Sequence, residues 1–174
     1  MHRALDALEA GFNRLTLFLA VLVAISIGLI TVLIPLNLLL IKFQWGSMWW
    51  LYEGVEYALY VGVFIGAPWV LHQGAHVRVD VVISALPPAQ ARQLERFLDL
   101  AGAALCLLLC YYGLRATIGE YHDGTLPDKD LRIANFYMTA VFAFSFLALA
   151  VEFLLRFRRA ARAEAAERAA REGF

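Results

Sequence analysis

Four histidines and two cysteines are the side chains of this 174-residue chain best suited to binding a metal or a cofactor. His72 and His76 stand four residues apart, a spacing that places both on one helical face, where they can chelate a metal ion. Gly74 lies between them, however, and no third ligand is close in the sequence. A haem in the membrane needs histidines within the spans, whereas all four histidines lie outside the uncharged apolar runs of the chain. We therefore predict no catalytic, cofactor-binding or metal-binding residue in this chain.

The two cysteines, Cys106 and Cys110, lie in an uncharged apolar run on the same helical face as Gly102. This pattern fits neither a disulfide framework nor a zinc site. Small residues on one face let membrane helices approach closely, and van der Waals packing then drives their association. We expect a helix-packing interface here rather than a redox site. A second stripe has the same four-residue spacing and the same interpretation; it consists of Gly54, Ala58, Gly62 and Gly66.

The composition indicates that these segments cross a membrane. Hydrophobic residues make up 61% of the chain and charged residues 17%, with a mean hydropathy of +0.65. A soluble domain is about half apolar and about a quarter charged, so part of this apolar surface must face lipid. A helix needs about 20 apolar residues to cross the bilayer core. The sequence predicts an all-α integral membrane protein, a single membrane domain over 1–174 with four spans at about 15–41, 53–72, 97–118 and 133–155.

The distribution of basic residues predicts the orientation, because Lys and Arg gather on the cytoplasmic side of a membrane protein. Eleven of the 15 Lys and Arg residues flank the two termini and the segment between the second and third spans. The other four are Lys42, Arg115, Lys129 and Arg132. Both termini are therefore expected in the cytoplasm. The tryptophan-rich segment 45–50 agrees, since aromatic anchors are expected where the first span reaches the outer interface.

Three segments are not expected to cross the membrane. From 5 to 15, apolar residues recur at three- and four-residue intervals, which predicts an N-terminal amphipathic helix on the membrane surface or, equally, a helical extension of the first span. The short segment 81–86 is expected to lie along the interface. A new helix should begin at Pro87 and Pro88, since proline is favoured in a first helical turn. The tail 156–174 has acid–base pairs four residues apart and predicts a solvated cytoplasmic helix.

The segment between the second and third spans also contains a family motif. His76-Val-Arg-Val-Asp80, with Gly74 before it and Leu86-Pro87 after it, resembles the signature of the small membrane subunit (Q subunit, DctQ-like) of tripartite ATP-independent periplasmic (TRAP) transporters. The length, the four spans, the inward termini and the paired acids Glu53 and Glu56 before the second span are also similar to that family. The resemblance extends to about residue 158.

The resemblance implies a non-catalytic subunit of a sodium-coupled transporter in the bacterial cell inner membrane. Its partners would be a large membrane subunit, which holds the sodium and substrate sites, a periplasmic solute-binding protein that delivers a small organic acid, and membrane lipids. The small subunit would widen the fixed scaffold beside an elevator-type transport domain and hold no cofactor itself. A net charge of zero argues separately against nucleic-acid binding.

Within the motif, His76, Arg78 and Asp80 are the residues expected to matter. Arg78 and Asp80 can form a structural clasp through charge-assisted hydrogen bonds, to each other, to the spans or to the partner. The alternative is that Arg78 only enforces the orientation of the chain. Two other functions stay open at this point, a small membrane redox or enzyme subunit and a stand-alone four-helix channel.

Overall fold

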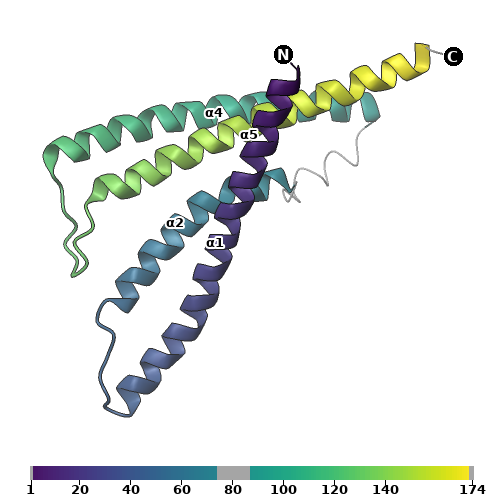
Figure 1. Ribbon diagram of the computed structural model, residues 1–174. Coiled ribbons are helices and arrows are strands. Elements are labelled where there is room, and N and C mark those ends of the chain that lie inside the picture. Colours follow the sequence, from purple (N-terminus) through teal and green to yellow (C-terminus); the bar gives the residue numbers. More distant parts are fainter. Residues whose placement is uncertain (1, 74–86, 173–174) are drawn as a thin grey trace.

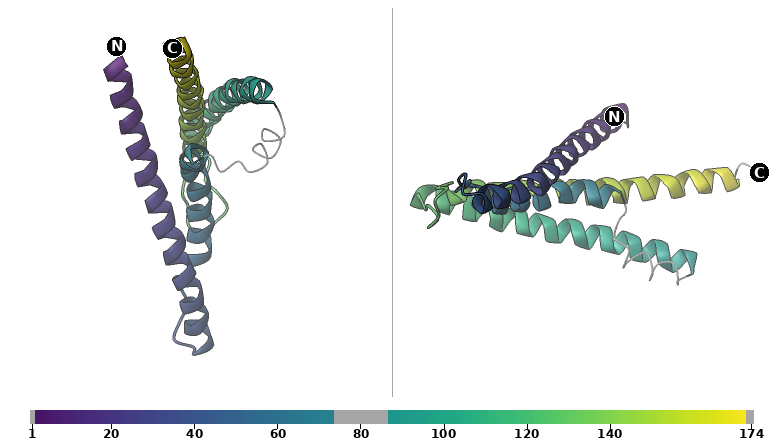
Figure 2. Two further views of the ribbon diagram at one scale, coloured as in Figure 1. Left: turned by 90° about the vertical axis from the view of Figure 1, so that its right-hand side faces the viewer. Right: turned by 90° about the horizontal axis from the view of Figure 1, so that it is seen from below.

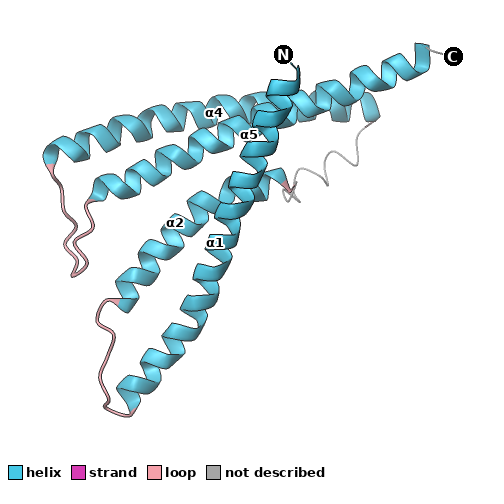
Figure 3. Cartoon of the chain, viewed as in Figure 1, coloured by secondary structure: helices cyan, strands magenta, loops and turns pink. Residues whose placement is uncertain are grey.

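The computed structural model describes residues 2–73 and 87–172. Within these ranges the chain consists of helices and loops, without a strand (Figure 3). The four helices are α1 (His2–Lys42), α2 (Leu51–His72), α4 (Pro88–Asp123) and α5 (Asn135–Glu172) (Figure 1). The motif residues His76, Arg78 and Asp80, and the segment 81–86, lie outside the described residues.

All four helices contain a stretch long and apolar enough to cross a membrane. The prediction of an all-α protein with four such helices is therefore confirmed. Each helix runs beyond the predicted span at one end or at both. The N-terminal segment continues into the first span as one helix from His2 to Lys42, the arrangement expected of a helical extension. The C-terminal segment likewise continues α5 to Glu172.

Local sequence signals explain where the helices begin and end. Helix α4 starts at Pro88 directly after Pro87, as the sequence predicted, because a proline in the first turn has no N–H that the helix needs. It stops at Gly124, whose left-handed backbone (φ +60°) ends the last turn. Helix α1 ends in a similar way: Gln44 has a positive φ of 58°, and the Trp45 N–H bonds to the Leu40 carbonyl at 3.0 Å.

The helices form two antiparallel pairs, α1 with α2 and α4 with α5 (Figure 1). The pairs diverge, and α2 packs against α5 where they meet. The loop between α4 and α5 nevertheless reaches the start of α2. The N-terminus and the C-terminus lie at the same end of the molecule, as a second view also shows (Figure 2). A chain that crosses a membrane an even number of times has both termini on the same side, and the four helices agree with this.

Small residues let α4 approach α5 closely. A Cβ added at Gly102 would lie 2.8 Å from the Phe153 ring, and one added at Gly113 would lie 2.8 Å from Phe142. Cys106 and Cys110, on the same face, are buried and carry free thiols. This face of α4 therefore packs within the chain, against α5.

A proline organises the contact between α2 and α5. Pro68 lies inside α2 and has no N–H, so the Phe64 carbonyl one turn earlier loses its helical donor. The hydroxyl of Ser145, which is completely buried, donates to this carbonyl. In a membrane interior an unpaired carbonyl is costly, and a neighbouring serine is one of the groups that can satisfy it. Rings of Phe64, Phe142 and Phe146 pack around the contact.

Candidate functional site

A buried carboxylate lies at the end of the bundle where the two termini meet. Glu152 of α5 is only 1% exposed. Its Oε1 atom lies 2.9 Å from Nδ1 of His72, the last residue of α2, and accepts a hydrogen bond from the Arg159 guanidinium one to two turns along α5. Arg159 Nη1 lies 3.2 Å from the same histidine nitrogen. The three side chains thus join α2 to α5.

Helix α1 joins the same cluster through two acids near its start. Glu9 Oε1 lies 3.3 Å from Arg159 Nε. Asp6 accepts hydrogen bonds from Arg158 and Arg162, both at 2.7 Å. Because α1 and α5 share few backbone contacts, these long side chains are the main connection between the two helices. We call Asp6, Glu9, His72, Glu152, Arg158, Arg159 and Arg162 the terminal charge cluster.

The fourth helix is attached at the same end by a separate ion pair. Asp99 of α4 is 2% exposed, and its Oδ1 atom lies 3.2 Å from Arg156 Nε of α5. A buried ion pair of this kind contributes little net stability. Removing one partner is nevertheless strongly destabilising, because the other charge stays buried without an opposite charge beside it. Together the two sets of contacts tie all four helices at the end near the termini.

The chemistry available to the cluster is that of fixed ion pairs. The Glu152 carboxylate shares one oxygen between a guanidinium and an imidazole, while its Oε2 atom is buried and has no hydrogen-bond partner in the structure. His72 faces an acid and an arginine. Over 2–73 and 87–172, no three His, Cys, Asp or Glu side chains gather as they would around a metal ion. The ion pairs of the cluster join α1, α2 and α5.

At the other end of the bundle, the paired acids of α2 hold the loop that precedes α5. The Glu53 carboxylate accepts hydrogen bonds from the backbone N–H groups of Asp130 and Leu131, at 3.0 and 2.6 Å. Glu56 pairs with Lys129, and this hydrogen bond raises the pKa of the Lys129 ammonium above its usual value. The same ammonium lies 5.0 Å from the centre of the Tyr57 ring. Glu53 and Glu56 thus have partners within the chain.

The predicted packing stripe on α2 is only partly covered. A Cβ added at Gly62 would lie 3.2 Å from Val23 of α1. At Gly54 the neighbour is Trp50 of the preceding turn, and Ala58 is half-buried. Gly66 has nothing within 4 Å of such a Cβ. The role of this stripe in binding another subunit stays a prediction.

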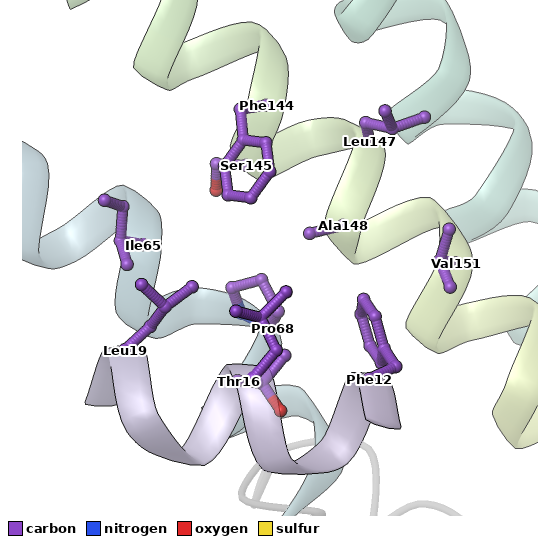
Figure 4. A pocket seen from close by; sticks show the side chains of 11 residues that line it. Phe12, Thr16, Leu19, Ile65, Pro68, Phe144, Ser145, Leu147, Ala148 and Val151 are labelled. Atoms are coloured by element: carbon purple, nitrogen blue, oxygen red, sulfur yellow. The ribbon is translucent and has the colours of Figure 1, made fainter. Parts of the chain in front are cut away.

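An apolar cavity of about 210 Å³ lies between α1, α2 and α5 (Figure 4). Its walls include Phe12 of α1, Pro68 of α2 and Val151 of α5. The two hydroxyls in the lining, those of Thr16 and Ser145, already donate to backbone carbonyls. The lining therefore offers a polar solute no unpaired side chain.

The sequence interpretation missed Glu152 and Asp99 as site residues. Glu152 lies within the fourth predicted span, 133–155, and Asp99 within the third, 97–118. A lone carboxylate in such a span is itself a signal, since an ionisable residue in a span nearly always has a partner. His72 was considered only as a metal ligand.

Four helices that are long and apolar enough to span, joined by ion pairs at the end near the termini, indicate a multi-pass integral membrane protein. The chain matches the model of the family described as tripartite ATP-independent periplasmic transporters, DctQ component, over residues 30–163. It belongs to this family and is thus a small permease component of a TRAP transporter, as the motif indicated. A match to a curated protein or to a solved structure was not found.

Proposed function

We propose that this chain is a non-catalytic scaffold subunit of a sodium-coupled TRAP transporter in the bacterial inner membrane. The observation that carries the proposal is the family match over residues 30–163, which includes part or all of each helix. The large permease subunit binds sodium and the substrate and moves as an elevator, while this chain stays fixed beside it. A periplasmic binding protein delivers a small organic acid to the pair.

The charged groups of the bundle support a static role. Glu152, Asp99 and Glu53 each bond to another helix or to a loop, and these bonds lie at both ends of the helices. A subunit that moved its helices past one another during transport would have to break buried ion pairs in every cycle, at a high cost in free energy. A fixed neighbour of a moving domain keeps them intact.

The proposal includes an orientation with both termini in the cytoplasm. The terminal charge cluster then lies on the cytoplasmic side, and the loop held by Glu53 and Glu56 faces the periplasm. The arginine-rich end of α5 supports this assignment, because basic residues are enriched on the cytoplasmic side.

Reconstitution of the three-part system tests the function. The chain, co-expressed with the permease gene beside its own, should co-purify with that permease as a stable pair. In proteoliposomes the pair should accumulate an organic acid only when the periplasmic binding protein and an inward sodium gradient are both present. Permease reconstituted alone is the control and should transport far less. Full uptake by the permease alone, or uptake without sodium, would contradict the proposal.

A further inference from the structure

Helix α4 has a second face that α5 does not cover. The residues that touch α5, from Asp99 to Gly113, lie on one side of the helix. Because an α-helix turns every 3.6 residues, a series at three- and four-residue intervals lies on the opposite side. These residues are all exposed, and we call them, with the neighbouring Tyr112, the outer α4 face: Ala101, Ala104, Leu108, Tyr111, Tyr112 and Arg115.

Arg115 lies within the membrane span predicted at 97–118, and its register against α5 places it away from the end of that span. Thr139 of α5 donates a hydrogen bond to Glu120, at 2.9 Å, and Gly113 lies beside Phe142. Arg115 is therefore level with the second turn of α5. This position is roughly six residues, or about 9 Å along the helix axis, after the first residue of α5. That start of α5 is followed by an uncharged run up to Glu152, so it marks the outer edge of the span.

A charge at this depth requires a partner. The Arg115 side chain is exposed, and none of the ion pairs or hydrogen bonds of the described chain includes its guanidinium. Ionisable residues inside spans otherwise face other protein groups. The other charges within the predicted spans, Glu53, Glu56, Asp99 and Glu152, all have partners in this chain. The missing partner of Arg115 therefore belongs to another molecule.

Two exposed tyrosines on the outer α4 face also indicate contact with another protein. Tyr111 and Tyr112 are 60% and 55% exposed, and their rings contact each other at a centroid distance of 5.4 Å. Neither hydroxyl bonds to a group of the chain within the ranges that the structure describes. Tyrosine and arginine are enriched at the centres of protein interfaces. The small side chains of Ala101 and Ala104, about two to three turns away from the tyrosines, allow a neighbouring helix to approach.

The outward side of α1 differs in kind. Its exposed residues in the middle of the span are aliphatic, as Leu22, Ile25 and Leu29 show. Lipid tails solvate such a surface well, but they supply no acceptor for a guanidinium or a phenol. A lipid phosphate can pair with an arginine, but only at the headgroup level, outside the uncharged run. The outward side of α1 therefore suits contact with lipid tails, whereas the outer α4 face suits contact with protein.

We propose that the outer α4 face docks a transmembrane helix of the large permease subunit, and that this helix carries a carboxylate opposite Arg115. The inference rests on the proposed function, because it assumes that the large subunit is the partner. It adds which side of the chain binds that subunit and which charge the partner supplies.

Photo-crosslinking tests the location of the interface. A photoreactive phenylalanine is placed at Leu108 or Tyr111 of α4, and at Leu22 or Ile25 of α1 as equally exposed controls. Each variant is co-expressed with the large subunit and irradiated in intact membranes. The α4 positions should crosslink to the large subunit with at least several-fold higher yield than the α1 positions. Crosslinks from α1 alone, or equal yields from both helices, would overturn the proposal.

Charge reversal tests the partner group. Arg115→Glu should reduce co-purification of the large subunit at least tenfold, while Arg115→Lys should keep most of it. The isolated Arg115→Glu subunit should melt like the wild type, because Arg115 has no partner in its own chain. Unchanged co-purification of Arg115→Glu would mean that Arg115 reaches lipid phosphates only, which overturns the proposal. Failure of the wild-type pair to co-purify would instead refute the proposed function, and this inference with it.

Discussion

At the residue scale, Glu152 and Arg159 allow a test of which partner of a buried ion pair matters more. Glu152 is almost fully buried, whereas the Arg159 side chain is 37% exposed and also contacts Glu9. We expect Arg159→Gln to destabilise the subunit by about 3 kcal/mol, the lower end of the range for a broken buried pair. Glu152→Gln should cost less, because it removes the buried charge itself. Thermal unfolding in detergent measures both changes.

Two comparisons make this prediction specific. The double variant Glu152→Gln with Arg159→Gln should be more stable than Arg159→Gln alone, since it leaves no buried carboxylate that has lost its guanidinium partner. Arg158→Gln is a matched control, because its partner Asp6 is 52% exposed and such pairs are worth roughly 0–1 kcal/mol. Equal losses in Arg158→Gln and Arg159→Gln would show that burial of Glu152 does not set the cost.

The sequence could have indicated these residues but not their partners. Glu152 and Asp99 are visible as single carboxylates near or within apolar runs, and such residues require a counter-charge. The partners, however, depend on how the helices meet: His72 lies 80 positions away from Glu152. Several arginines follow Glu152 at helical spacing, and nothing in that spacing alone selects Arg159.

At the scale of the helices, the contact of Ser145 with the Phe64 carbonyl predicts a rescue. Ser145→Ala removes the donor and leaves a buried carbonyl unpaired, which costs about 1–3 kcal/mol. Pro68→Ala supplies an N–H that can pair with the same carbonyl within α2. The double variant Ser145→Ala with Pro68→Ala should therefore recover part of the loss. The apparent melting temperature of the purified subunit is the measurement.

A matched loss of a hydroxyl at an exposed position is the control for any general effect of such substitutions on stability. Thr31 donates at 2.8 Å to the Ile27 carbonyl of its own helix and is exposed, so Thr31→Val should change stability little. If Pro68→Ala does not improve Ser145→Ala, the serine stabilises the bundle by packing and not by pairing the carbonyl.

Helix positions followed from the sequence better than helix lengths did. The start of α4 at Pro88 is a local signal, and so is the apolar length of each span. Helix α1 extends to His2 and α5 to Glu172, beyond the predicted spans. Asp6 and Glu9 lie in the N-terminal segment that was predicted as a surface helix or, equally, as an extension of the first span; neither alternative indicated that they pair with arginines of α5.

At the scale of the whole molecule, the divergence of the two helix pairs was not predictable. In water, apolar periodicity shows which face of a helix is buried, but in lipid an apolar face gains little by turning inward. Stripes of small residues indicated which faces allow close packing, yet Gly66 stays open while Gly102 contacts Phe153. The arrangement is set by polar contacts between distant residues, such as Ser145 with Phe64.

The orientation in the membrane gives the last prediction. Both termini lie at one end of the bundle (Figure 2). The terminal charge cluster joins α1 to α5 at that end. Eleven of the 15 basic residues flank that end or the connection between the second and third spans, and this excess should hold it in the cytoplasm. A reporter active only in the cytoplasm should therefore work when fused after Arg92 or Arg158. A reporter active only in the periplasm should work when fused near Trp45 or Asp128. A periplasmic signal at either terminus would contradict the orientation with both termini in the cytoplasm.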